Sequence, residues 1–248
     1  MNGLWKSVLE NTVFVLEFLG VVVGLFILAY IIEKLAQKKR GVKEKMLPTR
    51  KIAMIGMFSA IATILHLFDF PLPFAPGFYK LDFSEIPIMI GTFAFGPVSG
   101  VMMEFCKILL KLCIKGTSTA FVGDLANFVV GCSLIIPASA VYEFVKTKKG
   151  ALVGVIAGTI SLTVFGSAFN AIYLIPTFAN MYFAASEADP LAKIVSMGTA
   201  INPAITDVTT LVLYAVVPMN ILKGGVVSVV TMLVYKPLSV IIKSGGKS

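Results

Sequence analysis

Apolar stretches of about 20 residues recur along this chain, and short polar or basic segments separate them. The first runs from Val13 to Ile32 and contains one acidic residue, Glu17. About 20 mostly apolar residues are needed for a helix to cross the hydrocarbon core of a bilayer, so each such stretch predicts a transmembrane helix. Only 14% of the residues are charged and 57% are hydrophobic, whereas soluble domains carry about 25% charged residues. The sequence therefore predicts an all-α integral membrane protein.

Basic residues indicate the orientation of these helices. The chain has 21 lysines and arginines against 13 acidic residues, and most of the basic residues lie beside apolar stretches, at 34–51, at 146–149 and near the C-terminus. Basic residues next to spans mark the cytoplasmic side, which predicts a first span with its N-terminus outside and a C-terminus inside. For the 34–51 segment, topology and lipid contact is the simpler interpretation and a specific partner site the alternative. This placement disfavours nucleic-acid binding.

Six further spans are predicted, at 52–67, 86–95, 98–114, 122–145, 151–178 and 226–242. Residues 70–79 and 180–206 are predicted to form outer loops. The apolar stretch from Thr209 to Val217 is too short to span, so we expect an interfacial or re-entrant helix that ends at Pro218. The chain is thus divided into an extra N-terminal helix with a basic linker (1–49) and a six-span membrane domain (50–248).

The segment between the second and third spans combines proline, aromatic and charged residues. It reads FPLPFAPGFYKLDFSEIP over residues 70–87. In so apolar a chain, polar groups between spans are costly unless they line a site or face water. We therefore predict that this segment forms the lid and rim of a small-molecule site. Its aromatic residues offer apolar walls for a ligand: Phe70, Phe74, Phe78, Tyr79 and Phe83.

Polar side chains also occur inside the predicted spans. The 98–114 span and its outer end carry one acid and a stripe of lysines: Glu104, Lys107, Lys111 and Lys115. A structural ion pair between Glu104 and Lys107, a face that contacts another subunit and a substrate contact all remain open for this stripe. Asp124 lies near a helix N-terminus, where capping is its simplest role. Asn127 and Asn170 are predicted to project into the bundle.

Small residues gather on one face of the second span, at Ala53, Gly56 and Ala60. Such faces let helices approach closely in lipid, either within the chain or between subunits. His66, the only histidine, has no second ligand at metal-binding spacing, so we predict no metal site.

Known catalytic motifs are missing from the sequence. It contains neither HExxH nor GxSxG, and the terminal Gly-Gly-Lys-Ser lacks the upstream glycine and following helix of a phosphate-binding loop. We therefore predict that the chain is not an enzyme and needs no cofactor. Any energy that the protein uses must come from another subunit or an ion gradient.

Four short motifs together carry a family resemblance. They are KLDFSEIP (80–87), FGP (95–97), GDLANF (123–128) and PMNILKG (218–224). In this order, they resemble the riboflavin-binding substrate-specific (S) components, RibU type, of energy-coupling-factor (ECF) transporters, over residues 50–243. The resemblance implies a six-helix protein of the cell membrane that captures riboflavin at the outer face. It also implies a membrane coupling subunit (T component) and two cytoplasmic ATPase subunits as partners.

The resemblance further implies roles for individual residues. The ligand contacts would be Asn170, Asn220 and Lys223. The outer gate would include Asp82 with Tyr79 and Phe83. The helix that borders the pocket would contribute Asp124 and Asn127. The stripe of Ala53, Gly56 and Ala60 would dock on the coupling subunit, although Met57 interrupts it where the family tends to have alanine.

Two features of the ligand residues bear on these implications. Asparagine amides and a lysine ammonium match the donor and acceptor edge of an isoalloxazine ring. We expect Asn220 and Lys223 to have no structural role, so that replacing either weakens binding alone. The alternatives are an S component for another vitamin and a membrane-embedded enzyme or scaffold.

Overall fold

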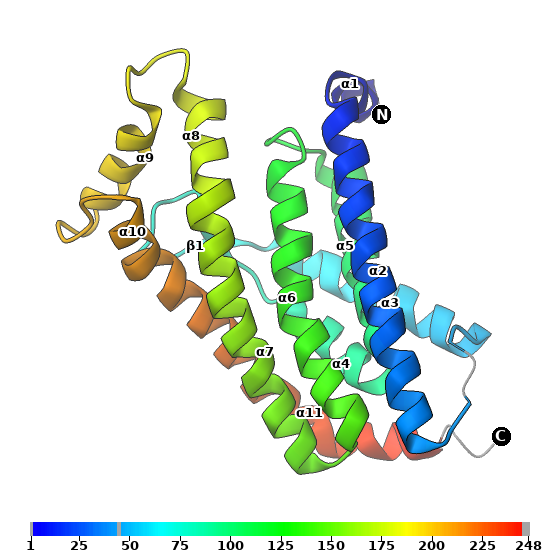
Figure 1. Ribbon diagram of the computed structural model, residues 1–248. Helices are drawn as coiled ribbons and strands as arrows, with labels where there is room; N and C mark the ends of the chain where they lie inside the picture. Colours follow the sequence, from blue (N-terminus) through cyan, green and yellow to red (C-terminus); the bar gives the residue numbers. More distant parts are fainter. Residues whose placement is uncertain (1, 44–45, 245–248) are drawn as a thin grey trace.

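The computed structural model describes residues 2–43 and 46–244, with side chains from residue 6 to residue 234 outside that gap. Its helices and strands are α1 (Asn2–Glu10), α2 (Thr12–Arg40), α3 (Thr49–Leu67), β1 (Phe70–Pro71), β2 (Lys80–Leu81), α4 (Glu85–Phe95), α5 (Pro97–Lys115), α6 (Val122–Val145), α7 (Lys148–Phe169), α8 (Ile175–Phe183), α9 (Pro190–Thr199), α10 (Val208–Leu211) and α11 (Val217–Ser244). Two π-helical segments, η1 (Asn170–Leu174) and η2 (Val212–Val216), join α7 to α8 and α10 to α11. α1 and the end of α11 lie at opposite ends of the bundle (Figure 1).

Five helical segments in the described part of the chain are long and apolar enough to cross a membrane: 12–40, 49–67, 122–145, 148–183 and 208–234. α4 is shorter, with 11 residues, and α5 has 19 residues that include buried charges. Together these segments correspond to the predicted N-terminal helix and the six spans after it. The all-α membrane fold predicted from the sequence is confirmed.

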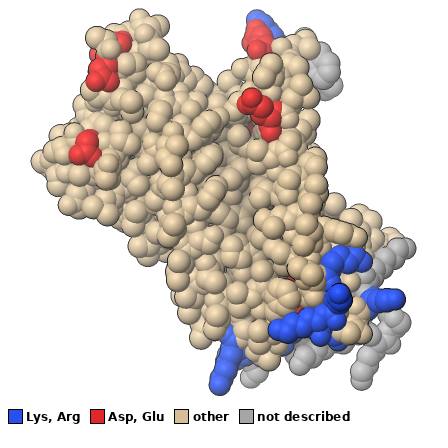
Figure 2. Space-filling model, viewed as in Figure 1, with Lys and Arg blue, Asp and Glu red and all other residues tan. Residues whose placement is uncertain are grey.

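Charged residues separate along the long axis of the molecule. On the face shown in Figure 2, most lysines and arginines lie at the lower end, while acidic residues gather at the upper end. The basic residues beyond residue 234 lie outside the described side chains. This polarity agrees with the positive-inside rule if the lower end is cytoplasmic.

The prediction of a separate re-entrant helix at Thr209–Val217 is wrong. α10, η2 and α11 form one continuous helical segment through Pro218. A proline inside an α-helix lacks an N–H group and clashes with the carbonyl four residues earlier. Here the chain widens into a π-turn just before the proline, and the Val217 N–H bonds to the Val212 carbonyl. This local widening accommodates the proline without ending the helix.

The predicted outer loop at 180–206 also differs from the structure. The preceding span continues to Phe183, and α9 (Pro190–Thr199) packs against α8. Asp189 caps α9 by accepting a hydrogen bond from the Ala192 N–H, with Pro190 in the first turn. An aspartate followed by proline is a recognised helix start, so the sequence did contain the signal.

The extra N-terminal helix belongs to the bundle. α2 packs on α5 and α6, where Phe18 lies against Phe128 with ring centroids 6.0 Å apart. At the end of the bundle where the basic residues gather, the buried Glu33 accepts a hydrogen bond from the Val98 N–H at the start of α5. Arg40 forms a 2.7 Å ion pair with Glu143 of α6. The basic segment therefore contributes contacts within the chain, in addition to the topology role predicted for it.

Candidate functional site

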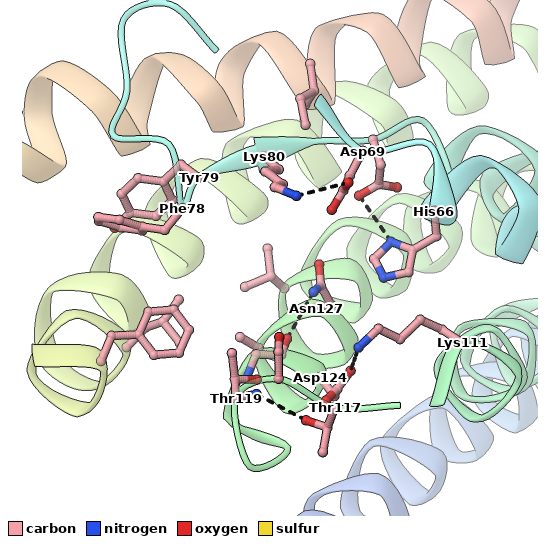
Figure 3. Close-up of a pocket in the computed structure, with 18 of the residues that line it drawn as sticks. His66, Asp69, Phe78, Tyr79, Lys80, Lys111, Thr117, Thr119, Asp124 and Asn127 are labelled. Atoms are coloured by element: carbon pink, nitrogen blue, oxygen red, sulfur yellow. Dashed lines mark hydrogen bonds and ion pairs between the residues drawn. The ribbon is translucent and has the colours of Figure 1, made fainter. Parts of the chain in front are cut away.

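A cavity of about 530 Å³ lies at the end of the bundle that carries the β1–β2 hairpin. The β1–β2 hairpin, the α5–α6 turn, α6, η1, α8 and α11 surround it. Figure 3 shows the hairpin residues Phe78, Tyr79 and Lys80 on one side of the cavity, with Asp124 and Thr117 facing them from the α5–α6 region. Its volume lies within the usual range for small-molecule sites.

Tyr79 ties the hairpin to the helices. Its hydroxyl donates a 3.0 Å hydrogen bond to Asn170 Oδ1, and Asn170 Nδ2 donates in turn to the Gly166 carbonyl at 2.8 Å. Burial raises the pKa of the Tyr79 hydroxyl. The group therefore stays a neutral donor at physiological pH, and the hairpin is held over the cavity as a lid.

Asp82 anchors the other end of this lid. Its carboxylate lies 3.4 Å from Lys223 Nζ of α11 and 3.4 Å from His66 Nδ1 at the end of α3. It also accepts a 2.8 Å hydrogen bond from the Ser84 N–H. Burial alone would raise the pKa of Asp82, but the Lys223 ammonium and His66 outweigh it and hold this pKa well below its usual value. The lid thus carries a stable negative charge that binds two helices.

A chain of buried charges continues beneath the cavity. Lys223 also contacts Glu85 at 2.9 Å, Glu85 contacts Lys107 at 3.2 Å, and Lys107 contacts Glu104 at 2.6 Å. The Lys107 and Glu104 side chains are fully buried. Glu104 packs so closely on α6 that a Cβ at Gly131 would lie 2.7 Å from its carboxylate. The Glu104–Lys107 ion pair, one of the three interpretations left open for the lysine stripe, is present, and Glu85 links it through Lys223 to the cavity.

The opposite wall of the cavity is also polar. Lys111 Nζ forms a 2.6 Å ion pair with Asp124 and donates to the Gly116 carbonyl at 3.0 Å (Figure 3). Thr117 lies beside this pair, and its hydroxyl accepts a hydrogen bond from the Phe121 N–H. Asn127 lines the same wall one turn deeper in α6.

Three residues that line the cavity each have a buried polar atom with no hydrogen-bond partner among the described residues. They are Asn220 (Nδ2), Asp124 (Oδ2) and His66 (Nδ1), and His66 Nδ1 lies within ion-pair distance of Asp82. Buried polar groups in folded proteins are nearly always hydrogen-bonded. An unpaired donor and an unpaired acceptor in one cavity are therefore suited to a ligand that presents both kinds of group.

The structure brings most of the predicted substrate residues together. The cavity is lined by Tyr79, Asp82, Asp124, Asn127, Asn170, Asn220 and Lys223. Phe83 is not among the lining residues and packs on Phe70, with ring centroids 5.7 Å apart. Lys223 also has the structural role, in its ion pairs with Asp82 and Glu85, that the sequence did not reveal.

Sequence reasoning missed several lining residues, among them His66, Lys111, Phe178 and Tyr182. Lys111 stands in the lysine stripe of α5, whose role the sequence left open. Phe178 and Tyr182 lie on one face of α8, four residues apart, which is a periodic signal. For His66, the sequence indicates only that a second metal ligand is missing at the required spacing.

The small-residue stripe of α3 faces away from the rest of the chain. Ala53, Gly56 and Ala60 are exposed, and no other atom lies within 4 Å of a Cβ placed at Gly56. Packing against the side chains that the structure describes therefore does not explain this stripe. Its exposure leaves contact with another membrane protein as the interpretation to test.

Comparisons with known proteins agree with one another. The family model described as ECF transporter, substrate-specific component, matches residues 50–235. The chain is 33% identical over 201 residues to the riboflavin transporter RibU of Staphylococcus aureus (strain TCH60), covering 81% of this chain and 96% of the relative. It is 30% identical over 187 residues to the riboflavin transporter FmnP of Bacillus subtilis (strain 168), covering 75% and 90%. A solved S component of a bacterial ECF transporter superposes with a TM-score of 0.59 at 32% identity, covering 78% of this chain and 98% of that one.

Proposed function

We propose riboflavin as the ligand of this cavity, from the premise that the chain belongs to the family of substrate-specific components of ECF transporters. It is a multi-pass membrane protein of a transporter and not an enzyme. Within that family, the chemistry of the cavity selects the ligand.

The observation that carries the proposal is the unpaired Asn220 Nδ2, which belongs to a residue that lines the cavity together with Asn170 and Lys223. The pyrimidine edge of an isoalloxazine ring offers carbonyl acceptors and one N–H donor, which amides and an ammonium can match. Phe78 and Phe178 supply apolar surface for the rest of the ring system. The ribityl hydroxyls would meet the polar wall formed by Asp124 and Lys111, where Asp124 Oδ2 is unpaired.

The lid explains how such a site would load. Tyr79 and Asp82 are its two attachments to the helices, so breaking these contacts would open the cavity to the outer side. In this proposal the N-terminus lies outside and the C-terminus inside, consistent with the basic lower end in Figure 2.

The exposed stripe of α3 supports the proposed partners. We infer that Ala53, Gly56 and Ala60 dock on a membrane coupling subunit, the T component, which two cytoplasmic ATPase subunits drive. No residue of α2 lines the cavity, which supports the division into residues 1–49 and a substrate-binding domain from residue 50.

Spectroscopy of the purified full-length protein tests the ligand directly. Riboflavin that co-purifies would make the sample yellow and fluorescent, and titration of ligand-free protein should quench riboflavin fluorescence in a saturable, one-to-one manner. Competition by unlabelled riboflavin, but not by thiamin or biotin, is expected. Saturable binding of a different vitamin with no riboflavin binding would overturn the proposal while leaving the family assignment intact.

A further inference from the structure

A second hollow lies on the membrane-facing side of the bundle, away from the substrate cavity. It is a groove of about 220 Å³ between α2, α6 and α7, helices that run side by side in Figure 1. Leu25 and Leu28 of α2 form one wall, Ser161 and Phe165 of α7 the other, and α6 the floor. The groove is apolar and opens to the outside of the protein, where the bilayer would be.

The α2 wall distinguishes this groove from the site described above. The family model begins at residue 50, so α2 lies outside the matched region. The groove therefore depends on the part of the chain that the shared family architecture does not include. A molecule that binds in this groove would therefore give the extra helix α2 a role.

One face of α2 leads from the groove to the basic end of the molecule. Leu25, Leu28, Ile32, Leu35 and Lys39 succeed one another at spacings of three and four residues, which places them on one side of a helix. From Leu28 to Lys39 the helix rises about 16 Å. Half of the hydrocarbon core of a bilayer is about 15 Å thick. With Lys39 at the inner surface of that core, the groove lies near the middle of the membrane.

Lys39 lies between α2 and α6, at the inner end of this face. Its Nζ is 5.4 Å from the centroid of the Phe144 ring of α6, and its side chain is exposed. Among the described residues, no acid lies within ion-pair distance of Lys39, whereas the neighbouring Arg40 is paired with Glu143. Lys39 is thus a positive charge available at the point where a lipid headgroup would meet the groove.

We propose that the groove binds an anionic phospholipid of the inner leaflet. One acyl chain fills the hollow between α2, α6 and α7, and the headgroup phosphate contacts Lys39. The length of α2 between the groove and Lys39 matches the reach of an acyl chain to the bilayer centre. A phosphate supplies the negative charge that Lys39 lacks within the described chain. The extra helix then serves as one wall of a lipid site.

Native mass spectrometry of the full-length chain tests this proposal. The purified protein is mixed with dioleoyl phosphatidylglycerol or with dioleoyl phosphatidylcholine, and the lipid retained per chain is counted. We expect one phosphatidylglycerol per wild-type chain and weaker retention of phosphatidylcholine. Lys39→Gln should lower phosphatidylglycerol retention about fivefold. Ser133→Phe, which fills the α6 floor of the groove, should lower retention of both lipids.

Two matched controls make the result specific. Lys38→Gln removes the same charge from the adjacent exposed position on α2, and Ile160→Phe adds a ring at an exposed position of α7 outside the groove. Neither should change retention. Thermal unfolding checks that each variant folds, and Ser133→Leu replaces Ser133→Phe if the latter does not.

Three outcomes would overturn the lipid site. Equal losses in Lys38→Gln and Lys39→Gln would mean that charge attracts lipid without a defined site. Wild-type retention in the Ser133 variants would place the acyl chain elsewhere. A wild-type chain that retains no lipid and elutes as a dimer would make a second copy of the protein the occupant.

Discussion

Replacing Lys223 with methionine separates its contribution to ligand binding from its contribution to the fold. The ammonium lines the cavity, and its side chain is 11% exposed. If it donates a hydrogen bond to the ligand, the lost charge-assisted bond is worth about 1.5–3 kcal/mol. At about 1.4 kcal/mol for each tenfold, the dissociation constant for riboflavin should rise roughly 10-fold to 150-fold.

The same substitution should also lower stability, contrary to the expectation from sequence alone. Removing Lys223 takes one cation from Asp82 and Glu85, yet Asp82 keeps His66 at 3.4 Å and Glu85 keeps Lys107 at 3.2 Å. Neither acid is left without a cationic neighbour. The cost should therefore stay below the roughly 3–5 kcal/mol of a buried charge stripped of its partner, at about 1–3 kcal/mol.

Lys80→Met is the matched control. Lys80 lines the same cavity and is paired with Asp69 at 3.3 Å, but its side chain is 44% exposed. An exposed ion pair contributes about 0–1 kcal/mol, so both affinity and melting temperature should change little. Fluorescence-quenching titration gives the affinity and a thermal-shift assay the stability. Equal losses of affinity in the two variants, or none in Lys223→Met, would refute a ligand contact by Lys223.

Three further changes test other parts of the structure. Gly56→Leu should abolish riboflavin uptake by cells but leave binding in detergent unchanged, because the exposed α3 face would no longer fit against a partner helix; a parallel loss of binding would contradict docking there. Lys107→Met should lower the free energy of unfolding by about 3–5 kcal/mol, because it leaves Glu104 buried without a partner. Adding Glu104→Leu removes that unpaired acid and should restore most of the lost stability. Equal free energies of unfolding for the single and the double variant, measured by chemical denaturation, would argue against the pair. Asp82→Asn should lower the melting temperature at least as much at pH 5 as at pH 7. In the folded wild-type protein the pKa of Asp82 lies below its unfolded-state value near 3.8. The stability that the Asp82 carboxylate contributes is therefore fully present above that value, and it is lost only as pH falls through the lower folded-state pKa. If the effect of the substitution fades by pH 5, Asp82 titrates in that range.

Features encoded by local spacing could be predicted from the sequence. Apolar length identified the spans, and a three-residue separation on one helix made the Glu104–Lys107 pair one of the interpretations of the lysine stripe. The partners of that pair could not be predicted in the same way. Glu85 reaches Lys107 from α4 and Lys223 from α11, and this three-helix junction depends on how the helices pack. Because Asp82 and Glu85 are far from Lys223 in sequence, the sequence alone does not distinguish this paired lysine from one that is free to bind a ligand.

The two π-turns set the helix faces on which Asn170 and Asn220 lie, and these faces do not follow from the residue spacing of an uninterrupted α-helix. η1 and η2 each end two residues before a proline, Pro176 and Pro218 respectively. The carbonyls four residues before these prolines, with which their rings would clash, lie inside the π-turns. A π-turn inserts a residue into the helix, so the residues after it rotate by about 100° relative to an uninterrupted α-helix. Asn170 is the first residue of η1, and Asn220 lies one turn after the end of η2. A helical wheel that assumes an uninterrupted α-helix through either proline therefore places the amide on the wrong face relative to the residues on the other side of the π-turn. Only with both turns formed do these two residues line the same cavity, where Tyr79 engages Asn170 and the nitrogen of Asn220 has no hydrogen-bond partner among the described residues.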